Sequence, residues 1–317
     1  MTGSACTECR VVEGLHRIPF IRFTSVHTSR RCELDESMVM IGASFEDEPV
    51  GLAVLQTNGA GEPSNLESIF VEPGHRRRGV GRELLGAVES SVGVSGASKV
   101  VGSWYHDAAG AEPIQRLLAD AGWTAPEAVS TRHQAGRRFL EQVDRASRPW
   151  RPRPGLEIEP WSALTPGDRR CVARLCEDRR VPTDLHPLND SMFEISERTS
   201  VLLRLRDEIA GWMIHHVLAP ELLRYSSLWI RPDLVGRGLG ISLAIESGRR
   251  HLATAGPAAR LSFAVSRDNE AMRRFVDRRL RAAVDRSSTM LYSEARPIGP
   301  RTTPRDSQRV PTGGDEG

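Results

Sequence analysis

The stretch Val71-Glu72-Pro73-Gly74-His75-Arg76-Arg77-Arg78-Gly79-Val80-Gly81 decides the fold, because a related stretch returns later as Ile230-Arg231-Pro232-Asp233-Leu234-Val235-Gly236-Arg237-Gly238-Leu239-Gly240. In both, an apolar strand leaves through a proline into a turn rich in glycine and arginine, and a helical pattern follows. Such a junction exposes backbone N–H groups at a helix N-terminus, and its glycines let an anion approach the main chain closely. The sequence therefore predicts two anion-binding turns.

The two halves of the chain also match outside these turns. Glu48-Pro49-Val50-Gly51 corresponds to Glu208-Ile209-Ala210-Gly211, and each segment precedes its turn by nearly the same distance. Two matches in one register indicate a duplication. We therefore expect two domains, at residues 17–147 and 156–295. A proline-rich linker at 148–155 joins them, and a disordered leader (1–16) and a disordered tail (296–317) flank them.

Composition narrows the class of protein. The 43 basic residues are nearly balanced by 41 acidic ones, so we expect no nucleic-acid partner. No apolar run approaches the length of a membrane span, and the odd number of five cysteines indicates a reducing cytoplasm and not a disulfide framework. Cys6 and Cys9 lack the second ligand pair that a zinc site needs, so no metal is expected.

Periodicity predicts a similar order of elements in each half. In the first half, strands are expected at 18–26, 38–45, 50–56, 66–71, 99–104 and 137–143, with helices at 81–92 and 113–121. In the second half, strands are expected at 156–161, 201–206, 209–217, 222–230, 261–265 and 287–292, with helices after Thr165, near 188–193, at 240–255 and at 269–280.

Other phosphate-binding motifs do not fit the turns. The third glycine of a dinucleotide fingerprint would fall at Leu84 or Leu243, and the chain's single lysine, Lys99, is followed by valine, which excludes a Walker loop. What remains resembles the GNAT superfamily of acyl-CoA-dependent N-acyltransferases, matched by Arg76 to Gly81 and again by Val235 to Gly240. The resemblance implies an α/β (α+β) fold with two tandem GNAT-like domains, each with a mixed, mostly antiparallel central sheet flanked by helices.

The resemblance also implies how acetyl-CoA, the co-substrate, would be held. The strands that end at Val71 and Ile230 would separate from their neighbours, so that pantetheine inserts between them. Backbone amides of the two turns would hold the pyrophosphate. The residues concerned are Arg76, Arg77, Arg78, Gly79, Val80, Gly81 and Arg82 in the first half, and Val235, Gly236, Arg237, Gly238, Leu239, Gly240 and Ile241 in the second. Asn269 matches the asparagine that opens the family's late helix, where it either caps the helix or contacts CoA.

Acyl transfer to an amine needs a proton acceptor and a proton donor. Alternation places Asn65, Glu67, Ile69 and Val71 on one strand face, which makes Glu67 the base candidate in the first half, with a solvated or structurally paired glutamate as the alternative. The second half has no carboxylate on that strand. His215 and His216 on the preceding strand face opposite ways, so one of them could reach a cleft, and His216 is the candidate, with a structural histidine as the alternative. The family's usual tyrosine is absent from both halves, and Tyr105 is the candidate donor.

The halves differ in the interval that builds the family's acceptor site. Only about ten polar residues, 28–37, separate the first two expected strands of the first half, whereas some forty do so in the second. This asymmetry suggests a composite site, or one active and one structural half. The expected activity is direct acetyl transfer from acetyl-CoA to the amine of a small molecule. The alternatives are a CoA-binding scaffold without catalysis and a protein N-terminal or lysine acetyltransferase.

Overall fold

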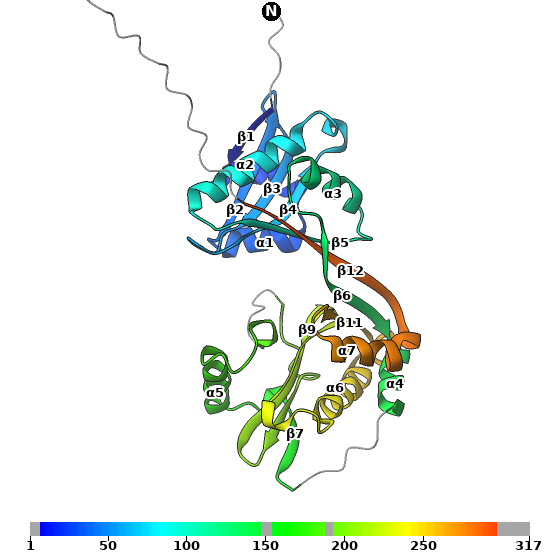
Figure 1. Cartoon of the computed structure of the whole chain (residues 1–317). Helices are drawn as coiled ribbons and strands as arrows, with labels where there is room; N and C mark the ends of the chain where they lie inside the picture. Colours follow the sequence, from blue (N-terminus) through cyan, green and yellow to red (C-terminus); the bar gives the residue numbers. More distant parts are fainter. Residues whose placement is uncertain (1–6, 147–153, 188–192, 297–317) are drawn as a thin grey trace, which may run out of the picture. The chain divides into compact units, whose positions relative to one another are not determined.

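The protein is described by a computed structural model that covers residues 7–146, 154–187 and 193–296. These residues form two compact units that are not contiguous in the sequence (Figure 1). Unit 1 contains residues 7–104, 110–127 and 292–296. Unit 2 contains residues 105–109 and the described part of 128–291. No helix in these ranges is long and apolar enough to cross a membrane.

Unit 1 is built on a mixed sheet with the strand order β1-β2-β3-β4-β5, followed by the end of β12. The pairs from β1 to β4 are antiparallel, and β4 and β5 are parallel. The strands are β1 (Thr7–Val11), β2 (Met38–Phe45), β3 (Glu48–Gln56), β4 (Ser64–Val71), β5 (Val100–Tyr105) and β12 (Val284–Ala295). The helices are η1 (Gly14–Phe23), α1 (Val26–Leu34), η2 (Pro73–His75), α2 (Val80–Ser95) and α3 (Ala111–Asp120).

Unit 2 has the strand order β12-β6-β11-β10-β9-β8-β7, in which β10 and β11 are parallel. Its other strands are β6 (Glu127–Gly136), β7 (Leu156–Pro160), β8 (Val201–Leu205), β9 (Glu208–Ala219), β10 (Leu222–Ile230) and β11 (Arg260–Ser266). Its principal helices are α4 (Arg137–Ala146), α5 (Pro166–Glu177), α6 (Leu239–Ala255) and α7 (Glu270–Phe275), which a π-helical turn, η7 (Val276–Leu280), extends. Short 3₁₀ turns are η3 (Trp161–Ala163), η4 (Thr183–Leu185), η5 (Pro232–Leu234), η6 (Gly256–Ala258) and η8 (Arg281–Ala283). The predicted fold class is confirmed.

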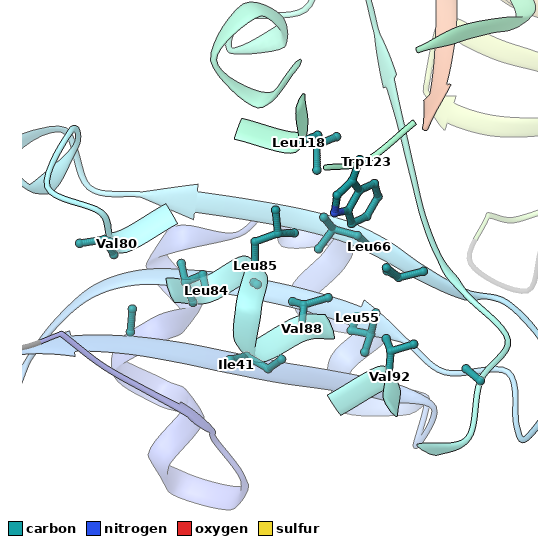
Figure 2. Close-up of a cluster of buried hydrophobic side chains, with 14 of the residues drawn as sticks. Ile41, Leu55, Leu66, Val80, Leu84, Leu85, Val88, Val92, Leu118 and Trp123 are labelled. Atoms are coloured by element: carbon teal, nitrogen blue, oxygen red, sulfur yellow. The ribbon is translucent and has the colours of Figure 1, made fainter. Parts of the chain in front are cut away.

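Each sheet is covered on both faces by apolar clusters. In unit 1, α2 packs its buried face, with Leu84, Leu85 and Val88, onto Ile41 and Leu55 of the sheet (Figure 2). The opposite face of that sheet holds Phe20 and Phe23 of η1, Cys32 of α1 and Phe70 of β4. In unit 2, α6 covers one face and α5 covers the other, around Trp161 and Trp212. We call the faces of the second sheet the α6 face and the α5 face.

The duplication extends to a backbone irregularity. β3 has a bulge at Val50 against β2, and β9 has the corresponding bulge at Ala210 against β8. The bulged carbonyls accept hydrogen bonds, both 2.9 Å long, from the N–H groups of Glu72 and Arg231, which follow β4 and β10. Each bulge therefore fixes the point at which the chain enters an arginine-glycine turn.

Several predicted elements are wrong in the first half. The leader is not disordered throughout, since β1 pairs with β2 from Thr7 onward. Residues 18–26 form most of η1 and the start of α1 instead of a strand. The interval between the first two strands therefore contains both η1 and α1, and the expected shortage of an acceptor wall in the first half disappears. Residues 137–143 lie in α4, and the last strand of this half is β6.

The second half follows its predicted order, with α7 and η7 together covering the predicted helix at 269–280. Three expectations concern residues outside the described ranges. They are most of the predicted linker (148–153), the short helix near 188–193 except for residue 193, and almost all of the tail.

Two strands exchange between the units. β6 lies in the first half of the sequence, yet almost all of it belongs to unit 2, where it pairs antiparallel with β11 over seven residue pairs. Conversely, the last residues of β12 belong to unit 1. There Thr124 donates its backbone N–H to the carbonyl of Glu294 at 2.9 Å. Each unit is thus completed by a strand from the other half of the sequence.

Candidate functional site: two strand separations and their anion cradles

In unit 1, the parallel strands β4 and β5 lose their pairing halfway along. They are paired only at Ser64–Val100, Asn65–Val101 and Leu66–Gly102, whereas β4 continues to Val71. A bulge against β3 lies at the next residue, Glu67. The strand separation that the sequence predicted for pantetheine is therefore present in unit 1.

Unit 2 repeats this arrangement. β10 and β11 pair from Leu222–Arg260 to Tyr225–Phe263, and β10 then continues alone to Ile230. A bulge against β9 lies at Ser226, the residue after the last parallel pair. Ser226 is thus the structural counterpart of Glu67, in the same register as the match of Val71 with Ile230.

The first turn forms an open cradle of N–H groups. Arg77 and Gly79 adopt left-handed backbone conformations, with φ of 62° and 92°, and Gly79 precedes α2 without any side-chain cap. Among the described residues, no acceptor receives the amides of residues 77–81. A Cβ at Gly79 would have no heavy atom within 4 Å. The turn therefore leaves room for an anion above five amides, next to the positive end of the helix dipole.

The second turn has the same shape with different charges. Gly236 and Gly238 have φ of 81° and 79°, and within the described residues the amides of 236–241 also have no acceptor. A Cβ at either glycine would again meet nothing within 4 Å. Arg231 of this turn forms ion pairs with Asp233 and Glu208, whereas the corresponding residue of the first turn is the carboxylate Glu72, which contacts Arg22 and His75.

Some predicted cofactor-binding residues already have internal partners. The side chain of Arg76 donates from Nε to the carbonyl of Val71 at 2.9 Å, and its amide bonds to Pro73. The amide of Arg82 donates a hydrogen bond to the carbonyl of Gly79. Asn269 caps α7 through a 3.1 Å hydrogen bond from the amide of Met272. Their contact with CoA remains a prediction.

Glu67 lies on a different face from the predicted one. The bulge interrupts the alternation. Ile69 and Val71 therefore pack with α2, whereas Glu67 accepts a 2.9 Å hydrogen bond from the guanidinium of Arg31, on α1. The side chains of Arg31 and Glu67 are 17% and 26% exposed. The base candidate of the first half is therefore held by a guanidinium on the η1 and α1 side of the sheet.

His216 lies in unit 2, on the α5 face. Its Nδ1 is 2.7 Å from the hydroxyl of Ser226, and its buried Nε2 has no hydrogen-bond partner among the described residues. Burial lowers the pKa of His216, which favours the neutral imidazole. His215 points to the opposite face, where it stacks on Tyr225 with ring centroids 3.7 Å apart.

Tyr105 belongs to unit 2 together with His216, whereas Glu67 belongs to unit 1. The three catalytic candidates are therefore divided between the units. Tyr105 stacks under the guanidinium of Arg132, 3.7 Å from its ring centroid, and within the described residues its hydroxyl has no hydrogen bond. The other two tyrosines are engaged, since Tyr225 contacts His251 and Tyr292 bonds to Glu294.

Comparison with known proteins agrees with this geometry. Residues 11–117 match the family model described as the acetyltransferase (GNAT) family. The mycothiol acetyltransferase of Clavibacter sepedonicus is 40% identical over 83 residues, which are 26% of this chain and 24% of that protein. The mycothiol acetyltransferase of Kineococcus radiotolerans is 38% identical over 122 residues, which are 36% and 37% of the two chains. The chain thus matches well under half the length of these relatives.

A solved tandem GNAT protein from the clavulanic acid biosynthesis pathway resembles nearly the whole chain. The TM-score is 0.62 at 16% identity, and the match covers 91% of this chain and 90% of that one. At this level of identity the likeness concerns the fold. The predicted resemblance is confirmed for the family of residues 11–117 and for the tandem fold of the whole chain.

Proposed function

Since the chain carries a GNAT acetyltransferase domain and has the tandem GNAT fold, we propose that it transfers an acetyl group from acetyl-CoA to the amine of a small molecule. One observation carries this proposal. An uncapped glycine cradle and a separated pair of parallel strands occur together in each unit. Acetyl-CoA would supply the activated acetyl thioester.

The residues of the chain would bind, orient and exchange protons. The amides of 77–81 and 236–241 point to sites for pyrophosphate. In unit 2, the imidazole of His216 would accept the ammonium proton of the acceptor through the hydroxyl of Ser226. Tyr105 would donate the proton that the departing thiolate needs. Much of the rate would come from holding the amine beside the thioester.

Unit 1 supports a second candidate function. Its carboxylate, Glu67, already accepts a hydrogen bond from Arg31 at 2.9 Å, so an amine or a water that approached it would compete with the guanidinium. This contact favours a first half that binds CoA without catalysis. Slow acetyl-CoA hydrolysis that Glu67→Gln abolishes would contradict that role.

For the acceptor, the names of the two relatives suggest an amine of the mycothiol type as one amine to test. Free thiol release would be followed with this amine and with a panel of other small amines, and acetylation of peptides would indicate a protein acetyltransferase instead. The proposal fails if the full chain neither binds acetyl-CoA by calorimetry nor releases thiol with any amine.

The cradle assignments predict the number of bound acetyl-CoA molecules. We expect two per chain, and Gly79→Glu and Gly238→Glu should each remove one, because each places a carboxylate where phosphate would lie. Gly74→Glu is the matched control, since this glycine lies before the open amides and also has nothing within 4 Å of its Cβ position. Unchanged stoichiometry in both cradle variants would refute the assignment.

A further inference from the structure

A row of polar side chains crosses four strands of unit 2 next to the strand separation. The paired positions are His216 on β9, Arg224 on β10, Ser262 on β11 and Gln134 on β6. Laterally paired residues project from the same face of a sheet, so this row lies on the α5 face with His216. The neighbouring row, His215, Tyr225, Phe263 and His133, is aromatic and lies on the α6 face.

Arg132 extends the polar row by one position. It pairs with Ala264, two residues beyond Ser262, and therefore projects from the same face. Its guanidinium stacks on Tyr105. Arg132 and Arg224 thus both project from the face that carries Ser226 and His216.

This surface has unused hydrogen-bonding groups. Arg132 is half-buried, and its Nε is buried without a partner. In the part of the chain that the structure describes, its guanidinium makes no hydrogen bond or ion pair, and the side chains of Ser262 and Gln134 make no hydrogen bond either. A buried donor without a partner is costly. A guanidinium that is stacked on a ring is already oriented to bind a planar or tetrahedral anion through two N–H groups.

We infer that Arg132, with Ser262 and Gln134, binds an anionic group on the acceptor, so that the amine substrate of unit 2 carries a carboxylate or a phosphate. This inference rests on the proposed acetyl transfer, because it places the anion on the acceptor beside Ser226. These three side chains supply cationic and neutral donors: a guanidinium, a hydroxyl and a carboxamide. Such a set selects an anion by charge-assisted hydrogen bonds.

The test uses matched pairs of amines with the full chain. Glycine is compared with glycinamide, and phosphoethanolamine with ethanolamine, by calorimetric binding in the presence of CoA and by thiol release from acetyl-CoA. We expect one anionic member to exceed its neutral partner by about ten- to a hundredfold, the factor for a hydrogen bond to a charged group. The pair that shows the preference distinguishes a carboxylate site from a phosphate site.

Variants of Arg132 identify the residue responsible. Arg132→Gln should remove the preference by weakening the anionic amine alone, and Arg132→Lys should restore part of it because the charge returns. Arg260→Gln is the matched control, an exposed arginine at the start of β11. Equal binding of charged and neutral amines, no binding of any of the four, or an equal loss of both members in Arg132→Gln overturns the inference.

The outcomes separate this inference from the proposed function. Thiol release from various amines without a preference for anions would leave acetyl transfer in place and remove the anion site. If the chain binds anions through Arg132 but does not bind acetyl-CoA, the anion site stands and the proposed acetyl transfer is refuted.

Discussion

At two positions of this protein, the close approach of neighbouring strands limits the residue to glycine. Gly51 and Gly211 are equivalent in the duplication, and each follows a bulge. A Cβ at Gly211 would lie 2.6 Å from the carbonyl oxygen of Trp229, and one at Gly51 would lie 2.9 Å from that of Phe70. Only a residue without a side chain lets β3 and β9 lie so close to the strands that enter the cradles.

This closeness predicts the effect of adding one methyl group. Gly51→Ala and Gly211→Ala should each lower the free energy of unfolding by about 1–3 kcal/mol, as overpacking does. Gly86→Ala is the control, since Gly86 lies on the exposed side of α2 with nothing near its Cβ position, and this change should raise stability by about 0.5–1 kcal/mol. Urea unfolding measures all three. Equal effects at the three positions would contradict the packing argument.

The catalytic candidates show what a sequence can and cannot specify at this scale. The residue types Glu67, Tyr105 and His216 follow from the chemistry of acyl transfer, whereas their placement depends on two features that leave no mark in the sequence. A bulge reverses the face of Glu67. Tyr105, the last residue of β5, belongs to unit 2 although the rest of that strand belongs to unit 1. The roles of Ser226 and Arg132 were missed for similar reasons, since a bulge turns Ser226 toward His216 and pairing with the distant strand β11 places Arg132.

At the scale of elements, the strands and helices around the turns could be predicted because their periodicity is strong. β2 has the predicted bounds, 38–45. The failures have a common physical cause. In residues 18–26, Phe20 and Phe23 are the buried pair, a spacing of three that suits a 3₁₀ helix better than a strand. In residues 137–143, Phe139, Leu140 and Val143 lie three and four apart, which is helical spacing.

The start of α5 is fixed by a pair of hydrogen bonds and an ion pair. Thr165 and Asp168 form a capping box, and Asp168 also binds Arg204 of β8 at 3.1 Å. These contacts, led by the hydrogen bond from Arg204, lower the pKa of Asp168 to about 2. The N-terminus of α5, the helix that covers the α5 face, is therefore linked to the sheet by the ion pair between Asp168 and Arg204.

Asp168→Asn tests this attachment by removing the charge with little change of shape. At neutral pH we expect the free energy of unfolding to fall by about 1–3 kcal/mol, the range for a helix cap and a charge-assisted hydrogen bond. Because the folded pKa lies below the unfolded value near 4, the contribution is complete above pH 4 and disappears as the pH falls toward 2. Urea unfolding of both proteins as a function of pH measures the difference. A deficit that stays constant down to pH 2 would show that the charge is not responsible.

At the scale of the whole molecule, the duplication and the strand exchange together distinguish a tandem chain from two separate domains. The duplication and most of the order of elements could be predicted from the sequence, except for β1, η1, α1, β6 and α4 of the first half. The exchange could not, because β6 carries few apolar residues and reads as polar: its sequence is Glu-Ala-Val-Ser-Thr-Arg-His-Gln-Ala-Gly. Seven residue pairs with β11 determine its position in unit 2. β11 lies more than a hundred residues later in the sequence.

The exchange predicts that neither half of the sequence folds alone. Residues 1–150 would lack the end of β12, and residues 151–317 would lack β6 and the segment 105–109. Each would therefore expose an unpaired strand edge, which promotes aggregation. We expect each fragment to be unfolded or aggregated when it is expressed singly, and the two expressed together to form a folded 1:1 complex. Size-exclusion chromatography with circular dichroism measures this, and the intact chain is the control. A folded monomer of either fragment would mean that the exchanged strands are dispensable, and that the two halves are independent domains joined only by the chain.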